Sequence, residues 1–215
     1  ASTGLGVGAS QRPLSSYDVL IGRASIAEAA VATRVPRLDL LPATVDLSGA
    51  EIEMVGLDDR VHRLRSALDR APPGRGNICL IDCPPSLGLL TVNALVAGRH
   101  LLVPLQCEFF ALEGLSQLLQ TVERIRTAFN PELQILGVAL TMFDRRNNLS
   151  QQVAEDVRAC LGPVVFETVV PRNVRLSEAP SHGLPALIYD LRCPGSAAYV
   201  SLARELMSRL PRHAD

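Results

Sequence analysis

The strongest constraint on the fold is the alternation, along most of the chain, of short apolar runs with longer amphipathic stretches. The runs at residues 78–81, 101–105 and 136–142 are almost continuously apolar, which is typical of strands buried on both faces of a parallel sheet. Between them, apolar residues recur every three or four positions, as in helices with one buried face. The sequence therefore predicts an α/β fold, with a mostly parallel sheet, right-handed crossovers and helices on both faces.

The same pattern places the remaining elements. Shorter strands are expected at residues 38–41 and 164–170. Capping-box spacing occurs at residues 25–28 and 48–51. Helices are expected at residues 26–33, 61–68, 87–97, 115–125, 149–161 and 199–210, and the Ala71-Pro72-Pro73-Gly74 stretch is expected to end the second of them. No repeat, linker or low-complexity tract interrupts this pattern, so residues 1–215 are predicted to form a single domain.

Composition narrows the class of protein. The 215 residues are 47% hydrophobic and 20% charged, which indicates a globular core rather than disorder. The net charge of −1 excludes a chain-wide basic field, so contact with nucleic acid must rest on a local patch. Five cysteines without a signal-like start indicate a reduced, cytoplasmic protein. All 21 basic residues are arginine, which excludes chemistry that needs a lysine of this chain.

The first residues do not begin an element. The chain starts at Ala1 with a stretch that has no apolar periodicity, so we expect it to start within a longer protein. Gly4, Gly6 and Gly8 invite comparison with a dinucleotide-binding loop, but such a loop follows a strand and opens a helix. Neither is predicted here, and a flexible loop is the preferred interpretation.

Asp82 is the first candidate site residue. It follows directly after the apolar run at residues 78–81, at the carboxyl end of a predicted strand, where parallel sheets bind ligands. A carboxylate there can hold a magnesium ion, or its bound water, beside a nucleotide phosphate. Alternatively, Asp82 caps the next helix, since Pro84 and Pro85 end the strand abruptly. The residues alone leave both roles open.

A family resemblance adds to this interpretation. Residues 80–87, Leu-Ile-Asp-Cys-Pro-Pro-Ser-Leu, resemble the Walker B segment of the ParA/Soj family of partition ATPases, which belongs to the deviant-Walker P-loop group. The segments at residues 16–20, 104–115, 140–144 and 171–181 are similar to further family blocks. The resemblance implies a P-loop NTPase fold of the ParA/MinD type that uses ATP, ADP and Mg²⁺.

The resemblance also implies a function. ATP drives a homodimer that binds DNA without sequence preference, and a ParB-like partner stimulates hydrolysis to release it. Such a protein is cytoplasmic, associates with the nucleoid and serves chromosome or plasmid segregation. For this chain, Asp82 would hold Mg²⁺ through water.

The sequence departs from the family at its start. Family members open with a strand, a glycine-rich loop bearing two lysines, and a second strand ending in an aspartate that positions the attacking water. This chain is expected to lack that opening βαβ portion, on the order of 40 residues. Phosphates need backbone N–H groups and a cation, so no catalytic residue is predicted here and hydrolysis by this polypeptide alone should be negligible. Low stability in isolation is also expected, because strand edges would be exposed.

The base end of a nucleotide site is expected to remain. By resemblance, Pro171, Arg172 and Asn173 lie beside the adenine, with Thr141 and Met142 at the neighbouring strand end. A proline ring and a thioether offer apolar faces, and an asparagine offers hydrogen bonds. The alternative is that Met142 belongs to the core and Pro171 only ends a strand.

Two arginines are the candidate DNA contacts. Arg146 and Arg175 match the positions through which the family binds DNA, and each follows a predicted strand. Phosphate contact needs only suitably spaced cations and makes the affinity salt-dependent. The alternative is a solvated face with local ion pairs. Leu184 stands where the family often has a lysine.

Other interpretations are weaker. Cys79, Cys83 and Cys107 are predicted to be small buried residues rather than metal ligands, and no histidine pairs with a serine or cysteine as in a hydrolase triad. A non-enzymatic module that binds a partner or DNA is the main alternative function. A MinD-like membrane ATPase ranks third, because residues 208–215 are short, broken by proline and without aromatic residues, so no membrane partner is expected.

Overall fold

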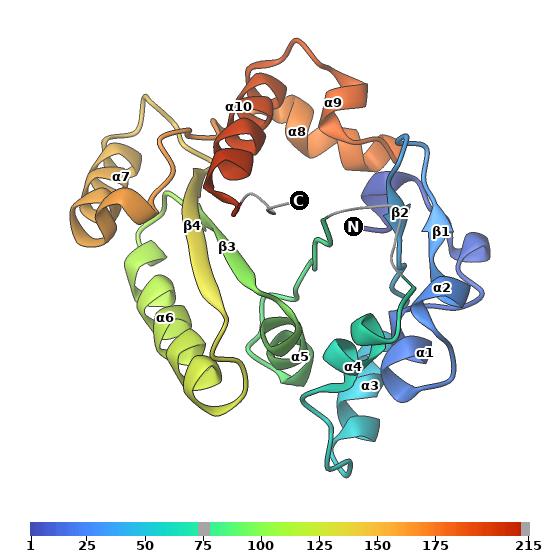
Figure 1. The fold of residues 1–215 in the computed structure, drawn as a ribbon. Coiled ribbons are helices and arrows are strands. Elements are labelled where there is room, and N and C mark those ends of the chain that lie inside the picture. The colour runs from blue at the N-terminus through green and yellow to red at the C-terminus, as the bar shows by residue number, and fades with distance from the viewer. Residues whose placement is uncertain (73–77, 212–215) are drawn as a thin grey trace. The chain divides into compact units, whose positions relative to one another are not determined.

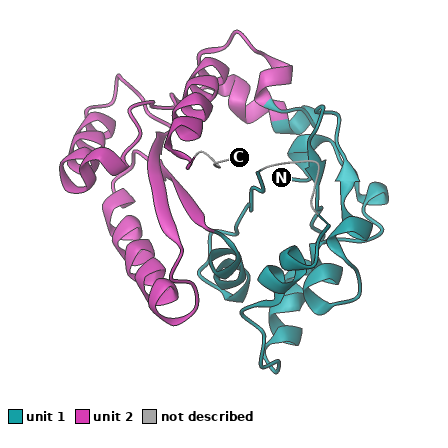
Figure 2. Cartoon of the chain, in the orientation of Figure 1, with its two compact units in different colours: residues 1–98, 180–185 teal, residues 99–179, 186–215 magenta. Residues whose placement is uncertain are grey.

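The computed structural model describes residues 1–72 and 78–211 (Figure 1). The chain divides into two compact units, residues 1–98 with 180–185 and residues 99–179 with 186–215 (Figure 2). Pro73 and Gly74, which were predicted to help end a helix, and the last four residues of the chain lie outside the described residues. The single-domain prediction stays a prediction.

The second unit holds the parallel sheet. β3 (His100–Gln106) pairs in parallel with β4 (Gln134–Thr141), with one irregularity between Leu101 and Leu102. The helices of this unit are α6 (Ala111–Ala128), α7 (Asn148–Leu161), α8 (Val174–Glu178), α9 (Ala186–Tyr189) and α10 (Pro194–Arg209). The predicted strands at 101–105 and 136–142 and the predicted helices at 115–125, 149–161 and 199–210 are confirmed.

Different helices cover the two faces of this sheet. Val138 and Leu140 of β4 pack into a core with residues of α6 and α7. Ala139, between them, packs with Phe166 and with Leu202 of α10 on the opposite face. Alternate residues of a strand point to opposite faces, and all three are buried here, which is why the run is continuously apolar. The α/β prediction, with parallel strands and helices on both faces, is confirmed.

The segment at residues 165–171 runs beside β4 but pairs with it only at its ends. Parallel bridges join Val165 to Val138 and Pro171 to Phe143. The predicted strand at 164–170 is therefore wrong as a continuous strand, although its direction and its neighbour agree with a parallel sheet.

A side chain of α10 explains the interruption. The N–H groups of Glu167 and Thr168 donate to the carboxylate of Glu205 at 2.8 and 3.0 Å, instead of to a strand. Arg209 Nη2 also donates to this carboxylate, at 2.9 Å. Glu205 thus ties α10 to the middle of the segment and satisfies two of its backbone N–H groups.

We expect Glu205→Gln to lower the free energy of unfolding by about 2 kcal/mol at neutral pH, because it weakens three charge-assisted hydrogen bonds. Partial burial raises the pKa of Glu205, but the Thr168 and Glu167 amides and Arg209 outweigh it, and the pKa is lowered overall. The stabilisation is therefore present above the unfolded-state pKa and is lost as the pH falls through the folded-state pKa. Urea unfolding at neutral pH and at about pH 3 measures this loss. Glu132→Gln, at an exposed site, is the control, and equal effects of both variants would contradict the role of Glu205.

The first unit is mainly helical. Its described residues contain a small antiparallel pair of strands, five helices and short 3₁₀ turns: η1 (Thr3–Leu5), η2 (Ala9–Gln11), α1 (Ser16–Ile21), α2 (Ile26–Ala29), β1 (Val31–Ala32), β2 (Asp39–Leu40), α3 (Leu47–Met54), α4 (Arg63–Asp69), α5 (Leu89–Ala97) and most of η4 (Ala179–His182). Leu20, Ala50 and Met54 form one of its cores, against which Leu64 and Leu89 pack. The helices predicted near residues 26–33, 61–68 and 87–97 are present, with shorter bounds.

One of the two predicted capping boxes is correct. Ser25 Oγ accepts from the N–H of Glu28 at 3.3 Å, and Glu28 accepts from the N–H of Ser25 at 2.8 Å. The prediction at residues 48–51 is wrong, since α3 begins earlier, at Leu47. Glu51 instead accepts from the N–H of Leu90 at 3.1 Å, in the first turn of α5.

The predicted buried strand at residues 78–81 is not observed. Leu80 is 81% exposed and Ile78 50% exposed, and no strand of the described residues pairs with them. A regular strand forms only when its backbone N–H and C=O groups are hydrogen-bonded to a neighbouring strand. The apolar pattern of residues 78–81 was therefore not sufficient to form a strand. Cys79 and Cys83 are exposed for the same reason, contrary to the prediction, whereas Cys107 is buried as predicted.

Within the described part of the chain, no helix is long and apolar enough to cross a bilayer.

Candidate functional site

The carboxyl end of β4 is the centre of the candidate site. β4 ends at Thr141, and Phe143, two residues on, pairs with Pro171. The N–H of Arg172 donates to the carbonyl of Phe143 at 3.0 Å. The structure thus brings the two predicted segments, with Thr141, Met142, Pro171 and Arg172, to one edge of the sheet.

Thr141 also joins this edge to β3. Its hydroxyl donates to the carbonyl of Leu105 at 3.2 Å, and its own carbonyl accepts from the N–H of Cys107 at 3.2 Å. Met142, the next residue, has φ 53°, in the left-handed region that non-glycine residues rarely adopt. Such strain costs on the order of 1–3 kcal/mol and tends to be kept at functional sites.

Asn173 lies at the start of α8. Its Oδ1 accepts from the N–H of Arg175 at 2.9 Å, which caps the helix. A neutral asparagine amide can still donate through its Nδ2. Because the cap fixes the orientation of the Asn173 side chain, the direction in which its Nδ2 can donate is also fixed, next to Pro171.

Arg146 is the more exposed of the two candidate DNA contacts. Its backbone N–H and its Nε donate to Asp144 Oδ1 at 3.0 and 3.4 Å, yet its side chain is 91% exposed. These hydrogen bonds, with the nearby charges of Arg146 and Arg172, lower the pKa of Asp144. The Arg146 guanidinium is therefore accessible to a phosphate, while its Nε and backbone N–H are bonded to Asp144.

Arg175 has a different environment. Nη1 lies 2.9 Å from Glu178 Oε2, and Nε lies 3.7 Å from Asp190 Oδ2. The hydrogen bond to Glu178 and its charge, with a smaller effect from Tyr189, raise the pKa of Arg175. A DNA phosphate would have to compete with two carboxylates. The i, i+3 spacing of Glu178 was readable from the sequence, whereas no local pattern indicated Asp190.

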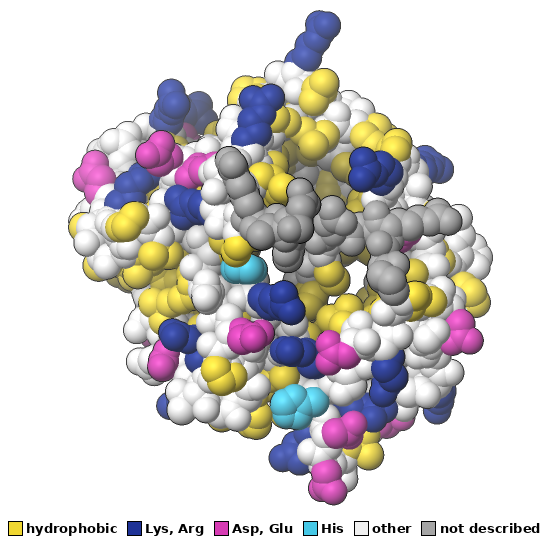
Figure 3. All heavy atoms as spheres, viewed as in Figure 1, with side chains coloured by type: hydrophobic (Ala, Val, Ile, Leu, Met, Phe, Trp, Pro, Cys, Tyr) yellow, Lys and Arg dark blue, Asp and Glu magenta, His cyan; other side chains and the backbone are white. Residues whose placement is uncertain are grey.

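Basic side chains do not dominate the face of the molecule that Figure 3 shows. Figure 3 shows basic and acidic side chains interspersed over the face in view, in keeping with the net charge of −1. If this chain contacts DNA, the contact depends on particular arginines rather than on a broad basic field.

Asp82, in the first unit, is not part of a preformed metal cluster. Its side chain is 71% exposed, and Oδ2 lies 2.8 Å from the amino group of Ala1. Residues 1–72 and 78–211 contain no group of three or more His, Cys, Asp or Glu that could hold a metal. A nucleotide-bound Mg²⁺ usually takes only one or two protein carboxylates, the other ligands being phosphates and waters. The exposed carboxylate of Asp82 fits that role.

The described residues offer fewer groups for binding the triphosphate of a nucleotide than for binding its base or its metal. Its binding requires consecutive backbone N–H groups and a cation at a helix N-terminus. The chain has no lysine, and no glycine-rich turn between a strand and a helix occurs among the described elements. The residues present therefore fit the base and the metal of a nucleotide, but not its phosphates.

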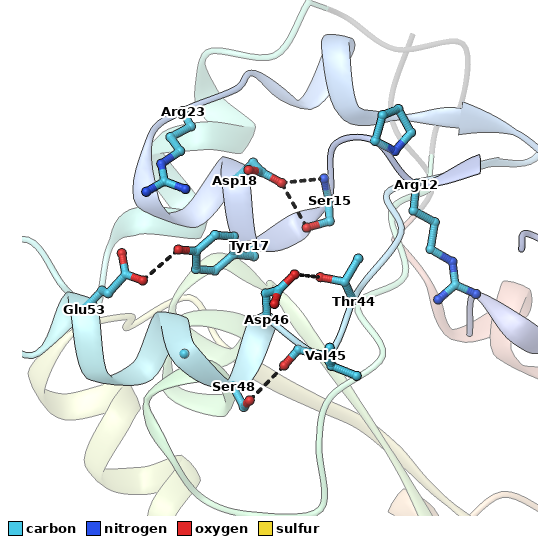
Figure 4. A pocket seen from close by; sticks show the side chains of 12 residues that line it. Arg12, Ser15, Tyr17, Asp18, Arg23, Thr44, Val45, Asp46, Ser48 and Glu53 are labelled. Carbon is cyan, nitrogen blue, oxygen red and sulfur yellow. Dashed lines mark hydrogen bonds between the residues drawn. The ribbon is translucent and has the colours of Figure 1, made fainter. Parts of the chain in front are cut away.

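The described residues of each unit line a groove. One, of about 600 Å³, lies between α1 and the start of α3 (Figure 4). The other, of about 520 Å³, lies at the carboxyl end of β3 and includes Phe109 and Phe110. Leu105, whose carbonyl accepts from Thr141, lines this second groove, which therefore adjoins the candidate base site.

Comparisons with known proteins agree with this picture. A family model described as an AAA domain matches residues 1–135. The chain is 58% identical over 209 residues to the chromosome partitioning protein ParA of Caulobacter vibrioides, covering 97% of this chain and 78% of that protein. It is 48% identical over 206 residues to the sporulation initiation inhibitor protein Soj of Bacillus subtilis, covering 96% and 81%.

A solved structure is similar over the whole chain. Cobyrinic acid a,c-diamide synthase from Mycobacterium smegmatis, with a bound ATP analogue and magnesium, matches with a TM-score of 0.83 and 32% identity, covering 100% of this chain and 82% of that one. The parallel strands, the helices on both faces and this likeness define a P-loop ATPase fold. Within that class, the chain belongs to the ParA/Soj family of partitioning ATPases, as its sequence motifs indicated.

Proposed function

We propose that the protein is a partitioning ATPase that dimerises with ATP and Mg²⁺ and binds DNA without sequence preference in that state. A ParB-like partner would stimulate hydrolysis and release the DNA. The protein would act in the cytoplasm, on the nucleoid, in chromosome or plasmid segregation. The observation that carries this proposal is the pairing of Phe143 with Pro171, which brings the residues proposed for the base end of a nucleotide site to one edge of the sheet.

The base would be held by both ends of that pairing. The Met142 thioether and the Pro171 ring offer apolar faces, and the amide of Asn173 offers a donor whose direction the cap fixes. Arg172, close enough to Asp144 to lower the pKa of that carboxyl, keeps a cation at the same edge. A base needs flat apolar contact and a few directed hydrogen bonds, which these groups supply.

Asp82 would orient the magnesium ion through water, and bound magnesium would neutralise charge on the phosphates. The phosphate-binding loop would come from residues outside these 215. The Caulobacter relative is longer, since the match covers 78% of it. Turnover by the 215 residues alone is expected to be at background.

Arg146→Ala in the intact protein with ATP should weaken DNA binding similarly for unrelated sequences, and should lower the salt slope by about one unit for each phosphate that the protein no longer neutralises. Arg175→Ala should have a smaller effect, because Glu178 and Asp190 already engage that guanidinium. Arg124→Ala, on the exposed side of α6, is the matched control. A salt titration of DNA affinity measures all three, beside a nucleotide titration that should stay unchanged for Arg146→Ala. If Arg146→Ala and Arg175→Ala both kept the DNA affinity and the salt slope of the wild type, the proposed contacts would be wrong. The two arginines would then be solvated surface residues.

A second candidate is a binding module without a nucleotide switch. The observation that favours it is that all 21 basic residues are arginine, so this chain cannot place a lysine on phosphate. Titration of the intact protein with a fluorescent ATP analogue separates the two. Saturable, magnesium-dependent binding supports the ATPase, and DNA binding without nucleotide binding supports the module.

A further inference from the structure

Two carboxylates from different segments of the second unit hold the guanidinium of Arg175. Glu178, at the end of α8, places its Oε2 2.9 Å from Nη1 of Arg175. Asp190, directly after α9, places its Oδ2 3.7 Å from Nε. We call Glu178 and Asp190 the Arg175 clamp. The side chain of Arg175 is still 54% exposed, so a phosphate from solution can reach the same guanidinium.

Other groups hold the clamp in place. Asp190 Oδ1 accepts from the N–H groups of the two residues that precede α10, both at 3.1 Å. The hydroxyl of Tyr189 donates to Glu178 Oε2 at 3.3 Å. Pairing with Arg175 therefore costs less side-chain entropy than it would for two unrestrained surface residues, which is the cost that makes most exposed ion pairs weak.

The clamp distinguishes the two candidate DNA contacts. The side chain of Arg146 is 91% exposed, and its guanidinium is accessible to a phosphate. At Arg175 a phosphate must take the place of a Glu178 oxygen. The clamp and Arg175 together carry one positive and two negative charges, so this part of the surface repels a polyanion as long as the guanidinium stays paired.

We propose that the Arg175 clamp is an autoinhibitory contact, which weakens DNA binding because its carboxylates compete with DNA phosphates for the guanidinium. This inference rests on the proposed function, because it concerns the DNA contact of that function. Glu178 is the stronger competitor, since it accepts a hydrogen bond from Nη1 at 2.9 Å. Asp190 acts mainly through its charge, because the amides before α10 prevent it from following the guanidinium. With the clamp closed, DNA binding would depend mainly on Arg146.

Glu178→Gln in the intact protein with ATP and magnesium is expected to raise DNA affinity about threefold to tenfold. The salt slope should steepen by about one unit, because Arg175 can then neutralise a phosphate. Asp190→Asn should give a smaller gain of the same sign. Both variants keep an oxygen acceptor for Tyr189 or for the amides before α10, so urea unfolding midpoints should stay close to the wild type.

Glu132→Gln is the matched control for the loss of one negative charge. Glu132 is exposed and precedes β4, so it lies at the opposite end of that strand from the candidate site. It should leave the DNA affinity and the salt slope near their wild-type values. Nucleotide affinity should be unchanged in all three variants, since none of them alters a residue proposed for the base or the metal.

A double-mutant cycle tests whether the gain depends on Arg175. In an Arg175→Ala background, Glu178→Gln should change DNA affinity no more than Glu132→Gln does. A second measurement needs no DNA. Phenylglyoxal modifies guanidine groups and reacts more slowly when they are paired with a carboxylate, so Arg175 should be modified faster in Glu178→Gln than in the wild type, as measured by mass spectrometry of its peptide.

Three results would overturn the inference and leave the proposed function intact. The first is wild-type DNA affinity in Glu178→Gln. The second is an equal gain in the Arg175→Ala background, since the effect would then come from the lost charge and not from the release of Arg175. The third is an unchanged rate of Arg175 modification by phenylglyoxal. If the wild-type protein bound no DNA with ATP, the proposed function would fail, and this inference would fail with it.

Discussion

Gly137→Ala is expected to lower the free energy of unfolding by about 3 kcal/mol, the effect of overpacking a core that cannot give way. A Cβ at residue 137 would overlap the ring of Phe166 and come within 2.8 Å of Arg209 Nη1. Phe166 is completely buried, and Arg209 Cζ lies 3.9 Å from the centre of its ring. The guanidinium is held further by the carbonyls of Val164 and Val165, at 3.0 and 3.1 Å. Neither neighbour can move without breaking these contacts.

Gly114→Ala is the matched control. Gly114 lies inside α6, and a Cβ there would meet nothing within 4 Å. Alanine should therefore raise the free energy of unfolding by about 0.5–1 kcal/mol through its higher helix propensity. Urea unfolding of the two variants measures the contrast. If Gly137→Ala were as stable as Gly114→Ala, the close packing of β4, Phe166 and α10 would be disproved.

Asp82→Ala in the intact protein is expected to lower magnesium-dependent ATP turnover about a hundredfold or more, if its carboxylate holds the metal beside the phosphates. Stability should change little, because the side chain is 71% exposed. Phosphate release at saturating ATP and a range of magnesium concentrations measures turnover. Asp156→Ala, at an exposed site in α7, is the control.

The two roles considered for Asp82 give opposite results. A metal-associated carboxylate predicts that turnover falls in a folded protein. A helix cap predicts a less stable protein whose folded fraction keeps wild-type turnover, and that outcome would remove Asp82 from the site.

The sheet and its covering helices were predictable because the spacing of apolar residues follows the burial of each element. A strand that is covered on both faces is apolar at every position, and a helix with one buried face is apolar at every third or fourth position. β4 contacts helices on both faces, so Val138, Ala139 and Leu140 are all apolar. The run at residues 78–81 has the same pattern, yet it is exposed and unpaired among the described residues. Apolar sequence shows that a strand could be buried, but the partner strands decide whether it forms.

The other errors came from side chains that bond far along the chain. Glu205 takes two amides of the predicted strand at 164–170, and Glu51 serves the start of α5 rather than its own helix. Spacing rules describe neighbours within one turn, so no local pattern shows such partners.

The candidate site was predictable in part. The family resemblance indicated that Thr141 ends the strand next to Pro171, and the pairing of Phe143 with Pro171 agrees with that neighbourhood. The chemical state of Arg175 was not predictable, since Asp190 lies fifteen positions away in sequence and 3.7 Å away in space. The strain at Met142 likewise depends on a backbone angle that its sequence does not reveal.

The most direct test of the proposed function is the DNA affinity of the intact protein with ATP and magnesium, with ADP and magnesium, and without nucleotide. Two unrelated duplexes of equal length should be compared at several salt concentrations. The account predicts tight binding only with ATP, equal for both duplexes, with a steep salt dependence. Binding that is the same with and without ATP would contradict it and would favour a DNA-binding module without a nucleotide switch.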